Sequence, residues 1–308
     1  MKFLTQSALY TDYYELTMAQ GYYLSGRAEK PATFDYFFRA MPFQSGYVVF
    51  AGLSDLLHIL NNLSFTDDEL HYLKGTGFTE DFINYLRDFE FTGDVYSVRE
   101  GELVFPQEPV IRVEGTIFEA QLIETLLLNI INYESLVATK AARIRSAAGT
   151  KKVLDFGLRR AQGYGGIHAS KAAIIGGIDG TSNVLSSYLY GLQPSGTMAH
   201  SWIQAFEDEL TAFRKYAEYY PDSCVLLVDT YDTLNNGLPN AIRVAKELEE
   251  KGHKMVGIRL DSGDLAYYSR RAREQLDAAG LDYVSIAVSN QLDEYLIRSL
   301  QTQGAPID

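Results

Sequence analysis

Residues 223–230 read SCVLLVDT, an apolar run that ends in two polar residues, Asp229 and Thr230. The same pattern returns in KMVGIRLD at 254–261 and in YVSIAVSN at 283–290, at the spacing of about thirty residues that is typical of a βα unit. Helical patterns follow the three runs, at 239–251, 265–279 and 293–301. Strands that are apolar on both faces and alternate with amphipathic helices form parallel sheets covered by helices. The sequence therefore predicts an α/β fold.

Polar clusters follow five of the predicted strands and favour a closed ring over an open sheet. They read DFGLRR from residue 155, GTMAHS from 196, VDTYDT from 228, RLDSGD from 259 and VSNQLDE from 288. Barrel enzymes carry their chemistry in the turns after all the strands, whereas open sheets use the turns at one switch point. We therefore expect a β/α barrel over 149–308. Because residues 304–308 read as the start of another strand, we expect it to be incomplete at its C-terminal end.

The part of the chain before residue 149 has a different organisation. Residues 1–116 mix helical patterns at 6–25, 53–60 and 67–74 with strand patterns at 32–38, 93–99 and 109–114. One apolar stripe at spacings of three and four then predicts a long helix over 117–148. We expect three segments: an N-terminal α/β domain (1–116), a connecting helix (117–148) and the barrel domain (149–308).

Composition excludes several classes of protein. The 308 residues carry 27 Lys and Arg against 40 Asp and Glu, a net charge of −13 that argues against nucleic-acid or membrane-surface binding. The single cysteine, Cys224, excludes an internal disulfide and a cysteine-rich zinc site. No apolar stretch has the length of a signal peptide or of a bilayer span, so we expect a cytoplasmic protein.

Three clusters carry candidate chemistry. Arg159 and Arg160 follow a strand end and offer a fork for phosphate or carboxylate, although solvated or paired arginines explain them as well. His200 suits a nucleophile, a proton shuttle or a structural side chain. The strongest cluster is RLDSGD at 259–264, where carboxylates suit Mg²⁺ or ribose hydroxyls beside a helix N-terminus. Together with Asp229 and Asp232, it predicts a site for a phosphorylated sugar with a metal ion.

The remaining histidines show no common ligand spacing. His58, His71, His168 and His253 lie in helical or loop patterns typical of a surface. We therefore do not expect them to form a metal cluster, and the sequence assigns no ligand set to the metal.

Eight motifs, in this order, resemble those of the nicotinate phosphoribosyltransferase family. They are TDYYELTM (11–18), FDYFFRAMPF (34–43), DFGLRRAQG (155–163), DGTSN (179–183), GTMAHSW (196–202), VDTYDT (228–233), RLDSGDL (259–265) and SNQLDE (289–294). The resemblance implies an N-terminal α/β domain and an irregular β/α barrel of the type II phosphoribosyltransferase kind. It also implies the condensation of nicotinate with 5-phosphoribosyl 1-pyrophosphate, in NAD biosynthesis by salvage. The reaction would depend on Mg²⁺ and on ATP hydrolysis through a phosphohistidine.

The resemblance also implies a role for each matching residue. Phe156 and, from the partner subunit of a homodimer, Tyr14 would stack on the pyridine ring at the subunit interface. Arg159 and Arg160 would hold the nicotinate carboxylate and phosphates, and His200 would be the phosphorylated residue. The ribose and phosphate site would be lined by Arg259, Asp261, Ser262 and Gly263, with Asp229 and Thr230 near it.

Ser182 bears on the choice of substrate. The nicotinamide-using relative has an aspartate at the corresponding place, which would accept from the carboxamide, whereas a neutral serine avoids like charge against nicotinate.

Members of the family continue past residue 308 into a turn that binds the sugar phosphate. A catalytically silent, truncated homologue that acts as a binding or dimerisation protein therefore remains an alternative, as does the nicotinamide-specific relative. An aldolase-like barrel would need a Schiff-base lysine at a strand end, and none of the strand-end clusters contains one. Quinolinate phosphoribosyltransferase would need more cations for its dicarboxylate substrate. Both functions are therefore disfavoured.

Overall fold

The computed structural model describes residues 7–308, which fall into two compact units. Unit 1 comprises the residues up to Ala142 together with Gly157–Ile178, and unit 2 comprises Arg143–Phe156 together with Asp179–Asp308. Contacts within the folded chain define these units, whereas the boundaries at 116 and 148 come from the sequence pattern and stay a prediction. Gln6, the first residue of the helix expected over 6–25, lies outside the described residues.

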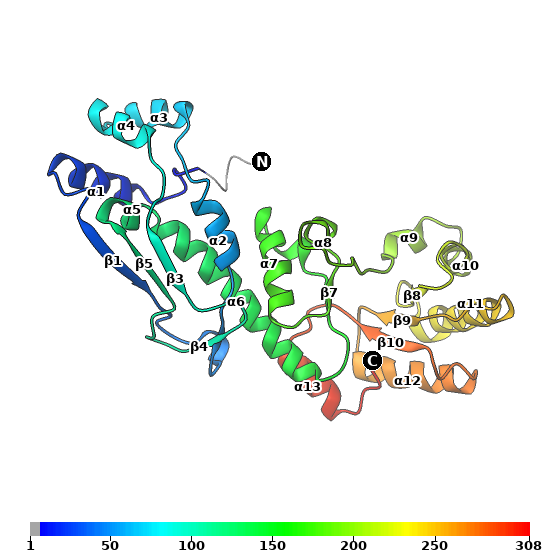
Figure 1. Ribbon diagram of the computed structural model, residues 1–308. Helices are drawn as coiled ribbons and strands as arrows, with labels where there is room; N and C mark the ends of the chain where they lie inside the picture. Colours follow the sequence, from blue (N-terminus) through cyan, green and yellow to red (C-terminus); the bar gives the residue numbers. More distant parts are fainter. Residues whose placement is uncertain (1–6) are drawn as a thin grey trace. The chain divides into compact units, whose positions relative to one another are not determined.

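Unit 1 contains an antiparallel sheet whose strands are β1 (Pro31–Tyr36), β5 (Ile111–Thr116) and β3 (Asp94–Ser97), in that order (Figure 1). Val113 of the central strand lies opposite Phe34 of β1 and Val95 of β3. The three expected strands are thus confirmed, with ends that shift by a few residues. A second antiparallel pair joins β2 (Val48–Val49) to β4 (Leu103–Val104).

Helices supply most of the remaining structure of unit 1. They are α1 (Tyr13–Leu24), η1 (Pro42–Gln44), α2 (Leu53–Leu60), α3 (Asp67–Lys74), α4 (Glu80–Arg87), α5 (Ile117–Leu122), α6 (Glu124–Ala148, of which the residues from Arg143 onward belong to unit 2), η2 (Leu158–Arg160) and α7 (Tyr164–Ile175). The bounds expected for α2 and α3 are confirmed. A capping box between Thr66 and Glu69 explains why α3 begins where it does. Phe50, Phe82 and Leu86 are among the fully buried side chains of the core.

The long helix expected over 117–148 is two helices, so that prediction is wrong in one respect. The break falls at Ile123, between α5 and α6. The backbone N–H of Thr125, in the first turn of α6, donates to Oε1 of Glu15 at 3.1 Å. A carboxylate from α1 thus satisfies an N–H group that an unbroken helix would have bonded internally. No periodicity within 117–148 reveals this contact.

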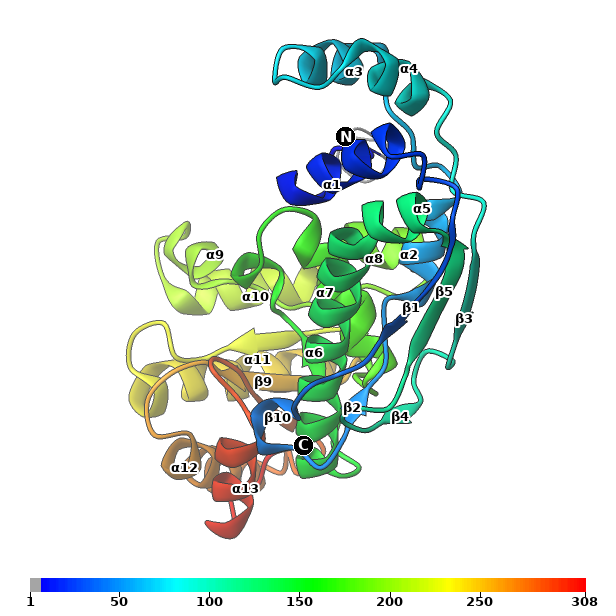
Figure 2. The same ribbon diagram turned by 90° about the vertical axis from the view of Figure 1, so that its left-hand side faces the viewer.

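Unit 2 is built on a parallel sheet whose strands are β10 (Ser285–Val288), β9 (Gly257–Leu260) and β8 (Val225–Leu227), in that order. Its other elements are β6 (Leu154–Asp155), β7 (Gly180–Thr181), α8 (Val184–Tyr190), α9 (His200–Gln204), α10 (Glu209–Tyr219), η3 (Thr233–Gly237), α11 (Leu238–Glu250), α12 (Leu265–Ala278) and α13 (Glu294–Thr302). Figure 2 shows α11 and α12 beside this sheet. The three expected parallel strands and the helices that follow them are confirmed.

The barrel is confirmed only at the coarser level of a mixed α/β chain. Within residues 7–308, β8, β9 and β10 form one parallel sheet, and β6 pairs with β7 in a separate parallel pair. A closed, irregular ring of strands stays a prediction. Close packing against β8 is nevertheless visible at Gly237, where a Cβ atom would lie 1.9 Å from the carbonyl oxygen of Val228. Only glycine allows η3 to approach the strand this closely.

Candidate active site

The carboxyl edge of the β10-β9-β8 sheet brings three strand ends into contact. Oδ2 of Asp229, after β8, accepts the backbone N–H of Asp261 at 2.8 Å and the hydroxyl of Ser262 at 2.6 Å. Ser289, after β10, donates its hydroxyl to Oδ1 of Asp261. Two carboxylates are therefore fixed side by side, as expected where parallel strands end at one edge.

His200 lies beside these carboxylates as the first residue of α9. Its Nδ1 is 3.1 Å from Oγ1 of Thr230, and its Nε2 is 3.8 Å from Oδ2 of Asp261. The imidazole is therefore oriented by a hydroxyl on one nitrogen and faces a carboxylate with the other. A partly exposed imidazole in this setting can accept a group through Nε2.

Arg259 and Gly263 shape the backbone around His200 and Asp261. The guanidinium of Arg259 donates to Oγ1 of Thr197 and, at 3.1 Å, to the carbonyl oxygen of Met198. This ties β9 to the loop that leads into His200. Gly263 has φ of +75°, and a Cβ atom there would lie 2.4 Å from the ring of Tyr268.

Phe156 and Ser182 follow the paired strands β6 and β7. The strands align Asp155 with Thr181, whose hydroxyl donates to Oδ2 of Asp155 at 2.8 Å. The backbone N–H of Ser182 donates to the carbonyl oxygen of Asp155 at 2.9 Å. Both candidate residues therefore leave this strand pair at the same edge.

Tyr14, Arg159 and Arg160 belong to unit 1, whereas the other sequence-predicted site residues belong to unit 2. Arg159 and Arg160 are exposed in η2. Tyr14 is 46% exposed on α1, and its hydroxyl donates to Oε1 of Glu124 at 3.2 Å. Burial, together with Glu124 and Glu15, raises the pKa of Tyr14 to about 12, so the phenol stays neutral.

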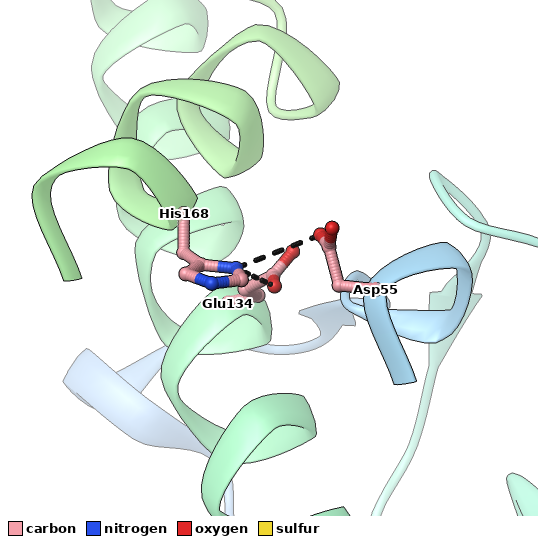
Figure 3. Close-up of side chains that lie close together, drawn as sticks. All are labelled: Asp55, Glu134 and His168. Carbon is pink, nitrogen blue, oxygen red and sulfur yellow. Dashed lines mark hydrogen bonds and ion pairs between the residues drawn. The ribbon is translucent and has the colours of Figure 1, made fainter. Parts of the chain in front are cut away.

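A second cluster in unit 1 shows that the interpretation of His168 as a surface residue was wrong. Its Nδ1 lies 2.8 Å from Oε1 of Glu134 and 3.6 Å from Oδ2 of Asp55 (Figure 3). Asp55 also forms an ion pair with Lys171. Burial opposes charge on the imidazole, but the adjacent carboxylates of Asp55 and Glu134 outweigh it and raise the pKa of His168 to about 9. Burial raises the pKa of Glu134 to about 7.

Sequence reasoning missed this cluster because its members come from three separate helices. Asp55 is on α2, Glu134 on α6 and His168 on α7. The one local signal is the spacing of His168 and Lys171, which places two cationic groups on the same face of α7. That signal points to acidic partners without identifying them.

Among the described residues, no helix is long and apolar enough to cross a membrane.

Family models of nicotinate phosphoribosyltransferase match most of the chain. The N-terminal domain model matches residues 9–132, and the nicotinate phosphoribosyltransferase family model matches residues 151–297. The second match contains the strand-end residues described above.

Individual proteins are similar to this chain over nearly its whole length. A nicotinate phosphoribosyltransferase of Bacillus subtilis is 52% identical over 303 residues, which cover 98% of this chain and 61% of the relative. The crystal structure of human nicotinic acid phosphoribosyltransferase has a TM-score of 0.90 at 35% identity and is matched over 96% of this chain and 71% of that one. A nicotinate-nucleotide pyrophosphorylase structure from Pyrococcus furiosus has a TM-score of 0.79 at 26% identity. The match covers 97% of this chain and 69% of that one.

The chain therefore spans about three-fifths of the length of the Bacillus subtilis relative. The matches nevertheless include two domain models of the family and run through both compact units. On these grounds, the chain belongs to the nicotinate phosphoribosyltransferase family.

Proposed function

We propose that this protein condenses nicotinate with 5-phosphoribosyl 1-pyrophosphate to give nicotinate mononucleotide and pyrophosphate, in NAD salvage. The observation that carries the proposal is the contact of Asp229, Asp261 and His200 at one sheet edge, in a chain of this family. During the reaction, the pyridine nitrogen bonds to C1 of the ribose as the bond from C1 to pyrophosphate breaks. Fixed carboxylates stabilise the positive charge that develops on the sugar in the transition state.

The strand-end carboxylates fit Mg²⁺, which binds through hard oxygen ligands. Oδ1 of Asp229 is buried and accepts no hydrogen bond from the described residues, which leaves one carboxylate oxygen for a cation or a substrate hydroxyl. Asp229 and Asp261 are therefore the residues that would hold the ion. When bound, Mg²⁺ neutralises charge on the departing pyrophosphate.

His200 provides the step that couples ATP to the cycle. Its Nε2 attacks the γ-phosphorus of ATP, the bond to ADP breaks, and the phosphoryl group passes later to water. Oγ1 of Thr230, 3.1 Å from Nδ1, keeps the imidazole oriented. The carboxylate of Asp261 faces Nε2 and stabilises the positive charge that develops on the ring during transfer. Arg259 contributes by holding the loop before His200 in place.

The pyridine ring would be bound between Phe156 and Tyr14 of the partner subunit, in a homodimer with sites at the interface. Stacking orients the ring nitrogen, and Arg159 and Arg160 supply the cations for the carboxylate and phosphates. Ser182, next to the ring site, presents no negative charge to nicotinate. We further propose that unit 2 forms the irregular β/α barrel of this family. The protein would work in the reducing cytoplasm, which is consistent with its single, buried and unpaired cysteine.

Product formation by two matched variants tests this proposal. Asp261→Asn should lower kcat for nicotinate mononucleotide by about 10²–10³-fold, because it removes a fixed charge beside the sugar. The control is Asp222→Asn, which also removes a carboxylate paired to a histidine, since Oδ1 of Asp222 lies 2.8 Å from Nδ1 of His253. The control should keep wild-type turnover. Equal turnover by all three proteins, or no product from the folded wild type, would overturn the proposal.

A further inference from the structure

We propose that Asp55, Glu134 and His168 form a binding site for one divalent first-row transition-metal ion in unit 1. One ligand atom from each residue lies within 4.8 Å of the other two, and the three side chains point toward one another from α2, α6 and α7 (Figure 3). This site is separate from the strand-end carboxylates proposed to hold Mg²⁺, which belong to unit 2. It also goes beyond the proposed function, which assigns these residues no role.

The spacing of the ligand atoms fits a shared ion. Metal–nitrogen and metal–oxygen bonds of about 2.1 Å place neighbouring ligands roughly 3.0–3.4 Å apart. Nδ1 of His168 lies 2.8 Å from Oε1 of Glu134 and 3.6 Å from Oδ2 of Asp55, one value just below this range and one just above. The third pair of ligand atoms, from Asp55 and Glu134, lies within 4.8 Å, so the three side chains would have to close around an ion.

Glu134 provides an independent sign that a cationic ligand is accommodated. Its side chain is 1% exposed, and its second oxygen, Oε2, has no hydrogen-bond partner among the described residues. Nζ of Lys171 lies 3.9 Å from this oxygen, which is beyond hydrogen-bond distance. A buried carboxylate oxygen without a donor is costly, and coordination to an ion would satisfy it.

The charges around the site favour a divalent ion. Asp55, Glu134 and Glu100 contribute three negative charges, and Lys171 contributes one positive charge within 4 Å of each of them. Once a metal ion displaces the proton of the imidazole, the protein groups carry a net charge of −2, which one divalent cation balances. Lys171 does not replace the ion, because it donates to Asp55 and to the hydroxyl of Ser54. It acts as the outer hydrogen-bond donor that ligating carboxylates usually have.

The donor set indicates which metals fit. One imidazole nitrogen with two carboxylates suits Mn²⁺, Fe²⁺, Co²⁺ or Zn²⁺, whereas Mg²⁺ prefers oxygen alone. Glu134 and His168 also line a cavity of about 500 Å³ within unit 1, together with Asn129, Tyr133 and Gln162. Three protein ligands beside a cavity leave coordination positions open for water or a small ligand.

Manganese binding to the full chain tests the site, without substrates. Electron paramagnetic resonance should show one tightly bound Mn²⁺ in the wild type that Zn²⁺ displaces and that Mg²⁺ at equal concentration does not. Any Mn²⁺ at the carboxylates of Asp229 and Asp261 is distinguished because Mg²⁺ displaces it. Glu134→Gln and His168→Gln should each weaken binding by at least about tenfold. The control is Glu209→Gln, because Glu209 is another buried glutamate with one unpartnered oxygen, in unit 2. It should bind Mn²⁺ as the wild type does.

Circular dichroism shows whether each variant folds. If the variants of Glu134 or His168 do not fold, a second measurement that leaves both residues intact tests the site. The Mn²⁺ complex of His200→Gln, which lacks the imidazole near Asp261, should still show coupling of the electron spin to a ¹⁴N nucleus. Absence of that coupling would overturn the proposal. So would equal affinity of folded Glu134→Gln and Glu209→Gln, or a wild type that binds no Mn²⁺.

Discussion

Individual residues at the sheet edge are held by neighbours rather than by their own secondary structure. His200 depends on Thr230 and Asp261, and Asp261 depends in turn on hydrogen bonds with Asp229 and Ser289. The sequence predicts that these residues lie together, because each of their motifs reads as the end of a strand. That expectation is confirmed for Asp229, Asp261 and Ser289 but is wrong for His200, since among the described residues no strand lies between α8 and α9. It does not predict that Arg259 turns to Thr197 and Met198, because that contact joins segments about sixty residues apart. His168 shows the same limit, since its carboxylate partners come from distant helices.

Gly263 is predicted to tolerate no side chain, for two separable reasons. Its φ of +75° costs an L-residue about 1–2 kcal/mol, and a Cβ atom would also meet the ring of Tyr268. Gly252 has φ of +83° with nothing within 4 Å of a Cβ atom, so Gly252→Ala carries the backbone cost alone. Urea unfolding should show a larger loss for Gly263→Ala than for Gly252→Ala. Equal losses would contradict the close contact with Tyr268.

At the scale of elements, caps and strand ends are predictable, but breaks caused by distant side chains are not. The capping box at Thr66 and the apolar runs of β8, β9 and β10 are local signals, and each predicts its element. The helix α4 (Glu80–Arg87) was missed, although Thr79 caps it and Phe82, Ile83 and Leu86 form its buried side. The break at Ile123 has no local signal, because it depends on Glu15 of α1.

Glu15 gives this junction a pH dependence. Burial raises the pKa of its fully buried carboxyl from 4.5 to about 7. Because the folded pKa lies above the unfolded one, its stabilising contribution is complete below pH 4.5 and is lost as pH rises to about 7. Relative to Glu15→Gln, which stays neutral, the wild type should lose up to about 3 kcal/mol across this window. Urea unfolding of both proteins at pH 4.5 and 7.5 measures the difference, and parallel pH curves would contradict it.

At the scale of the whole molecule, two compact units share the family's motifs, and the proposed roles draw on both. The expected α/β class and the family were predictable from eight ordered motifs. The arrangement of the short parallel strands in separate sheets was not, because strand order depends on non-local pairing. Tyr14 of unit 1 and Phe156 of unit 2 are the residues assigned to opposite faces of the pyridine ring.

Subunit mixing tests whether those two residues come from different subunits. Tyr14→Ala and Phe156→Ala should each have low activity alone. If sites form at a twofold interface, random exchange makes about half of the dimers mixed, each with one intact site, so activity should recover to about a quarter of wild type. Mixing Tyr14→Ala with His200→Asn should give the same recovery, since His200 and Phe156 are assigned to one subunit. An absence of recovery after demonstrated exchange would contradict the shared site.

The most direct test of the central claim is the ratio of kcat/KM for nicotinate to that for nicotinamide, with 5-phosphoribosyl 1-pyrophosphate, Mg²⁺ and ATP. Arg159 and Arg160 offer cations to a carboxylate, and Ser182 adds no negative charge, so the ratio should exceed about 100. Ser182→Asp should lower it by reducing kcat/KM for nicotinate. A wild type that uses both substrates equally, or prefers nicotinamide, would contradict the proposed function.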